Sequence, residues 1–99
     1  MTPHTKLRLD TMRYLLTLKP DGFFWPVAAS HKSSSGVPDI IGVYRGRFVG
    51  IELKVLPDKQ KPLQRWFMER ILGADGIGIV VGSVEDVKIM LAREGMMGE

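Results

Sequence analysis

Hydrophobic and polar residues alternate with period two along the second half of residues 47–55. Three aliphatic residues therefore share one face of a predicted strand, while Glu52 and Lys54 share the other. A second apolar run occupies residues 40–44, and only the dipeptide Arg-Gly separates the two runs. Because two residues form the commonest loop between antiparallel strands, the pattern predicts a β-hairpin.

The hairpin brings two carboxylates together. With Arg45 and Gly46 as the loop, Asp39 at the start of the first strand faces Glu52 on the second. Directly opposed residues have Cβ atoms roughly 4.5–5.5 Å apart, so the two carboxylates repel each other. A divalent cation between them would remove this cost, because Mg²⁺ is usually held by one or two carboxylates together with water and substrate phosphates. Lys54 would then lie beside the ion.

Two alternatives to this register remain open. A three-residue loop or a β-bulge would move the two carboxylates from a direct to a diagonal pairing. Glu52 and Lys54 are also compatible with the polar face of an ordinary amphipathic strand. That simpler interpretation does not account for Asp39 opposite Glu52.

Three segments have the pattern of helices. The first is predicted over residues 4–18 and places on one face Leu9, Met12, Leu15 and Leu16. The second begins at Pro62, a residue favoured in the first helical turn, and its predicted buried stripe is Leu63, Trp66, Phe67 and Ile71. The third follows Ser83, a preferred capping residue, and its apolar face is Val84, Val87, Met90 and Leu91.

Two further strands complete the predicted fold. Residues 23–29 begin with three aromatic residues, of which we expect two in the core and at least one pointing outward. Residues 77–81 are continuously apolar, as in a strand that is buried on both faces. The order α-β-β-β-α-β-α predicts an α/β fold, a mixed sheet flanked by helices. With 99 residues, we expect one domain over residues 1–99.

Composition narrows the class of protein. The sequence is 44% hydrophobic and 25% charged, as in ordinary globular proteins. It has no cysteine and no apolar run near the roughly 20 residues of a membrane span, so we expect a cytoplasmic protein without membrane contact. Residues 1–72 hold twelve Lys and Arg against six Asp and Glu, and this basic surplus favours a polyanionic partner without establishing one.

Two motifs carry a resemblance to a known family. They are Gly-Val-Pro-Asp-Ile-Ile-Gly at residues 36–42 and Gly-Ile-Glu-Leu-Lys at residues 50–54. An Asp followed by Glu-x-Lys is a weak pattern alone, but here it lies in apolar strands and precedes a helix, a strand and a helix. In this setting it resembles the PD-(D/E)xK nuclease superfamily, and specifically the stand-alone VRR-NUC (virus-type replication-repair nuclease) domain. The resemblance implies a restriction-endonuclease-like αβββαβα core.

The resemblance also implies roles for individual residues. Asp39, Glu52 and the backbone carbonyl of Leu53 would bind Mg²⁺, or Mn²⁺ in its place. Lys54 would hold the attacking water and stabilise the transition state. A glutamine beside the catalytic centre of VRR-NUC relatives matches Gln64. The catalytic set implied by the resemblance is therefore Asp39, Glu52, Lys54 and Gln64.

Two features are less well defined by the sequence. Family members often carry a glutamate on the first helix, whereas this helix offers only Asp10, which either substitutes for it or is a solvated surface residue. The polar loop before Gly36 is a candidate phosphate-binding segment through Lys32, Ser34 and Ser35. His31 in this loop is expected to be a surface histidine.

The function implied by the resemblance is metal-dependent cleavage of DNA. Stand-alone VRR-NUC proteins of viral type are similar to Holliday-junction resolvases, which implies a homodimer acting on four-way junctions. Two alternatives stay open: a flap or restriction-like endonuclease of the same superfamily, and a non-catalytic DNA-binding module. The candidates for the dimer interface are the aromatic segment at residues 23–25 and the first helix.

Overall fold

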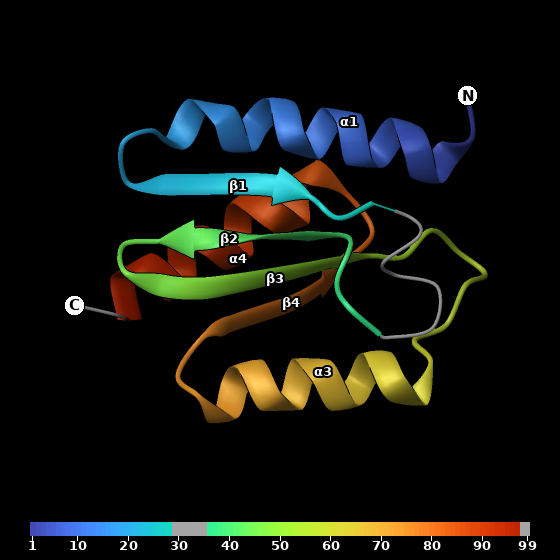
Figure 1. Ribbon diagram of the computed structural model, residues 1–99. Coiled ribbons are helices and arrows are strands. Elements are labelled where there is room, and N and C mark those ends of the chain that lie inside the picture. Colours follow the sequence, from blue (N-terminus) through green and yellow to red (C-terminus); the bar gives the residue numbers. More distant parts are fainter. Residues whose placement is uncertain (29–35, 98–99) are drawn as a thin grey trace.

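A computed structural model describes residues 1–28 and 36–97 of the chain. The element order confirms the predicted αβββαβα pattern, with one short 3₁₀ turn added (Figure 1). The elements are α1 (Pro3–Leu15), η1 (Leu16–Leu18), β1 (Gly22–Pro26), β2 (Ile40–Tyr44), β3 (Arg47–Leu53), α3 (Pro62–Gly73), β4 (Ile77–Val81) and α4 (Val84–Met97). Within the described ranges, no helix is long and apolar enough to cross a membrane.

The four strands form one mixed sheet in the order β1-β2-β3-β4 (Figure 1). β2 pairs antiparallel with both β1 and β3, and β4 pairs in parallel with β3. The parallel pair requires a crossover, which α3 provides. The predicted mixed sheet flanked by helices is therefore confirmed.

Helices cover both faces of the sheet. On one face, α1 and α4 contact each other and contribute Leu15, Val87 and Leu91 to the main core, where these residues meet the inward side chains of all four strands. On the other face, α3 packs against β3 and β4. The capping residue predicted for α4 is confirmed, because the Ser83 hydroxyl accepts a hydrogen bond from the backbone N–H of Asp86 at 3.1 Å.

The β2–β3 hairpin has the predicted two-residue turn. Arg45 and Gly46 have φ values of 50° and 82°, the left-handed conformation that a type I′ turn requires. The turn fixes a register that runs from Tyr44 opposite Arg47 to Ile40 opposite Ile51. The direct pairing chosen from the sequence is confirmed, and the diagonal alternative is wrong.

Two glycines fix the path of the chain into β2. A Cβ atom at Gly50 would lie 2.6 Å from the Ile71 side chain and 2.9 Å from the Pro38 ring, so α3 and Pro38 pack directly on the backbone of β3. Gly36 has a φ of 76°, and a Cβ atom there would lie 2.5 Å from the Leu63 carbonyl oxygen. The segment that carries Asp39 is thus held between α3 and the sheet.

The buried faces of α1 and α3 differ from the prediction. In α1, Thr11 and Leu15 are buried, whereas Leu9 is exposed, because residues two apart on a helix point in nearly opposite directions. Leu16, at the start of η1, is exposed as well.

In α3, Met68 and Ile71 form the buried row, and Leu63 is exposed. Trp66 is 54% exposed, so its assignment to the core is wrong. The close approach of α3 to Gly50 and Gly78 leaves room for only one row of side chains beneath the helix.

The sheet itself also has an exposed part. Of the three aromatic residues in β1, only Phe24 is buried, so the expectation of two core aromatics is wrong. Phe23 and Trp25 point away from α1 and α4, and α3 lies over β3 and β4 rather than over β1. Val80 in β4 is exposed too, so this strand is not buried on both faces as predicted.

Candidate active site

The register of the hairpin places Asp39 and Glu52 at opposed positions. Ile40 pairs with Ile51, so the next step outward along the two chains brings Asp39 across from Glu52. Asp39 lies just before β2, and Glu52 is the penultimate residue of β3. The two residues are 1% and 3% exposed. Two acidic residues buried this deeply at neighbouring positions are costly in a purely structural role, because each disfavours the charge of the other.

Asp39 is tied to its surroundings through both its side chain and its backbone. Its Oδ2 atom accepts a hydrogen bond from the backbone N–H of Leu53 at 2.8 Å. Its carbonyl oxygen accepts one from the N–H of Val27 at 2.9 Å, which links the site to the chain leaving β1. The Asp39 carboxylate is therefore held in one orientation at the end of β3, beside Glu52 and Leu53.

A histidine on α1 reaches the same place. The Nε2 atom of His4 lies 3.2 Å from the Leu53 carbonyl oxygen and 3.5 Å from Oδ1 of Asp39. His4 did not emerge from the sequence motifs, which begin at residue 36. The signal that identifies it is its helical position, because His4 lies seven and eleven residues before the buried Thr11 and Leu15 and thus on the same face of α1.

Lys54 follows directly after β3. Its backbone N–H donates to the Val81 carbonyl oxygen at 2.8 Å, which extends the pairing of β3 with β4 by one residue. Its side chain is half-buried and, by strand alternation, lies on the same side of the chain as Glu52. Glu52, Leu53 and Lys54 thus form one short stretch at the C-terminal end of β3.

Gln64 occupies the first turn of α3. Its Oε1 atom accepts a hydrogen bond from the backbone N–H of Lys61, the N-cap residue, at 2.8 Å. The Gln64 side chain therefore stabilises the start of α3, close to where Gly36 passes the helix. The structure therefore gives Gln64, which the sequence predicted for the site, a structural task at the N-cap of α3.

Other candidates from the sequence have different outcomes. Lys32, Ser34 and Ser35, proposed for DNA binding, lie outside the described residues, as does His31. Asp10 forms ion pairs on the surface of α1, with Lys6 at 2.7 Å and with Arg13 at 3.3 Å. The hydrogen bond from Lys6 holds the pKa of Asp10 below its ordinary value. These ion pairs agree with the second alternative, in which Asp10 is a solvated residue of the helix.

The chemistry of the site fits a hard divalent cation. Asp39, Glu52 and the Leu53 carbonyl offer oxygen donors, which Mg²⁺ prefers. Among residues 1–28 and 36–97, no group of three or more His, Asp or Glu side chains is arranged to hold a metal ion by itself.

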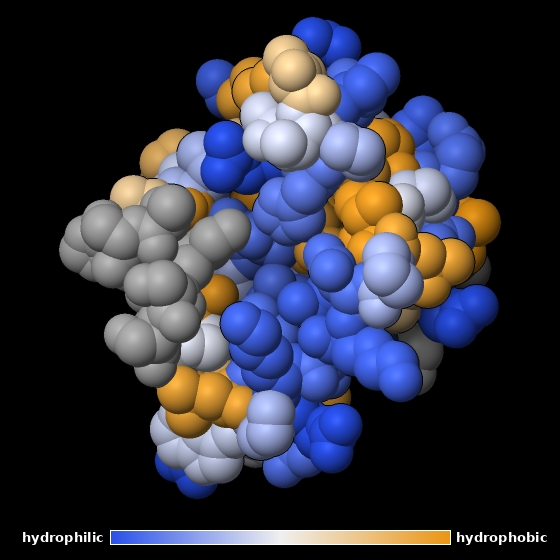
Figure 2. All heavy atoms as spheres, turned by 90° about the vertical axis from the view of Figure 1, so that its right-hand side faces the viewer, coloured by the Kyte–Doolittle hydropathy of each residue, from blue (hydrophilic) through white to orange (hydrophobic). Residues whose placement is uncertain are grey.

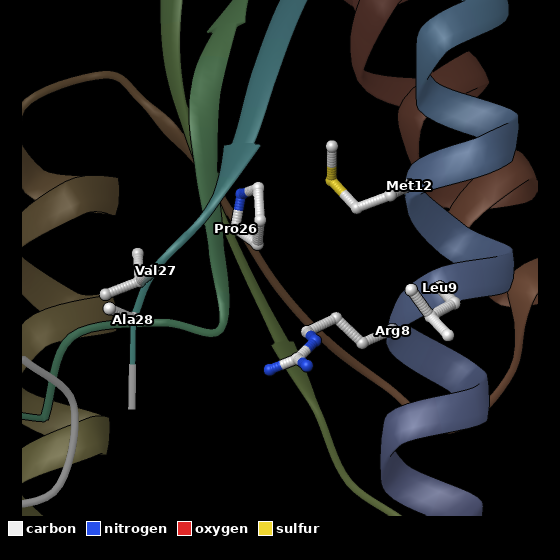
Figure 3. Close-up of a pocket in the computed structure, with 6 residues that line it drawn as sticks. All are labelled: Arg8, Leu9, Met12, Pro26, Val27 and Ala28. Atoms are coloured by element: carbon white, nitrogen blue, oxygen red, sulfur yellow. The ribbon is translucent and has the colours of Figure 1, made fainter. Parts of the chain in front are cut away.

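A pocket opens next to this site. It has a volume of about 490 Å³ and is lined by Arg8, Leu9, Met12, Pro26, Val27 and Ala28. In Figure 3, Arg8 extends from α1 toward the chain leaving β1. Val27 connects this pocket to the site through the backbone, because its N–H donates to the Asp39 carbonyl oxygen.

The end of the molecule that carries the site is polar at its centre. Figure 2 views the end at which α1 and α3 begin, and hydrophilic residues fill the middle of this face between hydrophobic groups. The connection to α3 contributes the exposed lysines Lys59 and Lys61. This end therefore combines cationic side chains with the buried carboxylates.

A comparison with solved structures identifies the fold. A solved structure described as a VRR_NUC domain matches this chain with a TM-score of 0.72 and 22% sequence identity. The match covers 93% of this chain and 97% of that chain. No protein-family model and no curated protein matches the sequence. The resemblance seen in the two motifs thus holds for nearly the whole backbone, and the chain has the fold of a VRR_NUC domain.

Proposed function

We propose that the protein is a cytoplasmic, divalent-metal-dependent endonuclease that hydrolyses DNA phosphodiesters, with four-way junctions as its substrate. The observation that carries this proposal is the buried pair Asp39 and Glu52, opposed across the β2–β3 hairpin in a VRR_NUC fold. A fold alone does not specify an activity, so the argument rests on the chemistry of these side chains.

Each residue of the site has a proposed role. Asp39, Glu52 and the carbonyl of Leu53 would hold Mg²⁺ or Mn²⁺, which when bound supplies an acidic water and neutralises charge on the phosphate. Lys54 donates hydrogen bonds to the attacking water and to the negative charge that develops in the transition state. Gln64 uses Oε1 to cap α3, and we assign its amide nitrogen to the edge of the site.

DNA binding is assigned to the basic residues around the carboxylates. Arg8 borders the pocket beside Asp39, and a guanidinium group suits bidentate contact with a phosphate. The predicted contacts of Lys32, Ser34 and Ser35 would extend this surface. Phosphate contacts of this kind position a substrate without reading its sequence, as a structure-specific nuclease requires.

The exposed sheet face supports a homodimer. We define the sheet patch as four exposed residues on one face of β1, β2 and β3: Phe23, Trp25, Val43 and Phe48. Val43 pairs directly with both Phe23 and Phe48, and the rings of Phe23 and Trp25 are 5.1 Å apart. Contiguous apolar surface of this kind marks interaction sites. A two-fold dimer would place two sites on a junction, which itself has approximate two-fold symmetry.

The test is a cleavage assay on three substrates of matched sequence: a four-way junction, a flap and a linear duplex. We expect the wild type with Mg²⁺ to introduce paired, symmetrical nicks into the junction. The Asp39→Asn variant is expected to bind the junction without cutting it. Cleavage that persists in EDTA, or in Asp39→Asn at the wild-type rate, would refute the proposal.

The same assay separates the alternatives. Preference for the flap or for the duplex would assign a different endonuclease activity to the same site. Junction binding without cleavage by the wild type, under all divalent metals tried, would identify a non-catalytic DNA-binding module.

A further inference from the structure

His4 is held firmly at the candidate site by the fold of α1. The Thr2 hydroxyl accepts a hydrogen bond from the Thr5 N–H at 3.1 Å and fixes the first turn of the helix. About two and three turns after His4, Thr11 and Leu15 are buried, and Leu15 packs in the main core. Because His4 shares their face, the imidazole is directed toward the end of β3 by the packing of the whole helix.

The distances around His4 allow a bound cation as well as a hydrogen bond. The contact of Nε2 with the Leu53 oxygen, at 3.2 Å, is at the long end for a hydrogen bond, and the contact with Asp39 at 3.5 Å exceeds it. Two donors bound to one metal at about 2.1 Å lie about 3.0 Å apart at right angles and about 3.4 Å apart at a tetrahedral angle. One cation can therefore join these atoms after small movements.

We infer that His4 is a nitrogen ligand of the cation bound by Asp39 and Leu53, and that the site prefers Mn²⁺ or Co²⁺ to Mg²⁺. This inference rests on the proposed metal-dependent function and adds the identity of the metal. Imidazole nitrogen favours first-row transition ions, whereas a site made of oxygen atoms alone suits Mg²⁺. With Glu52, the ligand set would be three side chains and one carbonyl, and water would complete the shell.

The first experiment needs no variant. The intact protein is loaded with Mn²⁺ in the absence of DNA, and pulsed EPR is used to detect coupling of the manganese electron spin to nitrogen. Coupling characteristic of an imidazole ligand is expected. A spectrum without nitrogen coupling in protein that binds Mn²⁺ would overturn the inference.

The second experiment measures metal affinity by calorimetric titration of the wild type and of two variants. His4→Gln keeps a hydrogen-bond donor for the Leu53 carbonyl but removes the imidazole, and His4→Glu replaces nitrogen by carboxylate oxygen. We expect His4→Gln to lose on the order of tenfold or more in Mn²⁺ affinity with little change for Mg²⁺, as for a lost metal-site contact. His4→Glu is expected to move the preference toward Mg²⁺.

Two results would contradict this assignment. Unchanged Mn²⁺ affinity in His4→Gln would mean that His4 only hydrogen-bonds to Leu53. Tighter binding in His4→Gln would mean that the imidazole competes with the cation. Both readouts are independent of DNA cleavage: a wild type that binds Mn²⁺ through His4 but cuts no DNA would refute the proposed function alone. If the protein cuts DNA but its Mn²⁺ affinity is the same in the wild type and in His4→Gln, this inference alone would be refuted.

Discussion

The carboxylate of Asp39 and the backbone N–H of Leu53 are joined by a 2.8 Å hydrogen bond across the end of the β2–β3 hairpin. This bond occupies Oδ2, while Oδ1 lies 3.5 Å from Nε2 of His4. One side chain thus both closes the hairpin and presents an oxygen atom to the site. Two different substitutions of Asp39 can therefore separate its structural role from its chemical role.

Asp39→Asn and Asp39→Ala are expected to differ in stability but not in activity. The asparagine retains an oxygen acceptor for Leu53, whereas alanine leaves a buried N–H unsatisfied at a cost of about 1–3 kcal/mol. Both remove the negative charge and should abolish cleavage. Chemical denaturation measures the stability difference, and junction cleavage measures activity. Equal unfolding free energies for the two variants would contradict the structural role of the hydrogen bond.

Lys54→Met is expected to lower the rate of cleavage by about 10²–10³-fold, as for other groups that stabilise developing charge. Metal affinity and junction affinity should change little, because the lysine is proposed to act in the transition state. Single-turnover kinetics at saturating enzyme provide the measurement. Lys59→Met, an exposed lysine in the following connection, is the matched control. Equal loss in both variants would indicate a general charge effect rather than a role for Lys54.

Arg8→Gln is expected to weaken junction binding and to reduce the slope of log K against log salt by about one, as for one lost phosphate contact. Arg13→Gln serves as the control, because Arg13 lies on the exposed surface of α1 and pairs with Asp10. Fluorescence anisotropy at several salt concentrations gives both slopes. If the slope of the Arg8 variant equals that of the wild type, the pocket beside Asp39 does not bind phosphate.

Phe23→Glu is expected to convert the proposed dimer to a monomer, because it would place two like charges in the sheet patch, the proposed interface between copies. Ile89→Glu changes another exposed apolar residue, on α4, and should leave the proposed dimer intact. Light scattering coupled to size-exclusion chromatography reports the mass. Junctions should then be nicked on one strand at a time by the monomer. A Phe23→Glu variant that remains dimeric would exclude the sheet patch.

Asp10→Asn is expected to leave DNA cleavage unchanged and to alter only the pH dependence of stability. Because the Lys6 hydrogen bond lowers the pKa of Asp10 in the folded state, its stabilisation is present above the ordinary carboxyl pKa. It is lost as the pH falls through the lowered pKa. Urea midpoints of wild type and variant should therefore differ at neutral pH and converge in acid. Loss of cleavage would instead place Asp10 in the site.

The hairpin was predictable because its information is local. Two residues separate the strands, so alternation and loop length together determined that Asp39 faces Glu52. His4 was not predictable in this way, since its partner Leu53 lies 49 residues away and the contact depends on how α1 docks. The exposure of Leu9 and Trp66 was unpredictable for the same reason, because it depends on how each helix docks on the sheet. An apolar residue on a helix indicates burial, but the sheet selects the face that is buried.

The long sequence separation between His4 and Leu53 has a consequence for folding. The hairpin can align its two acids while the rest of the chain is still loose, because only a short loop must close. The histidine arrives only when α1 has docked, so the full set of donors exists in the native state alone. A cation that uses all of them would bind native molecules selectively and raise the melting temperature in proportion to the logarithm of its concentration. Thermal melting with and without metal would then report whether α1 has docked against the end of β3.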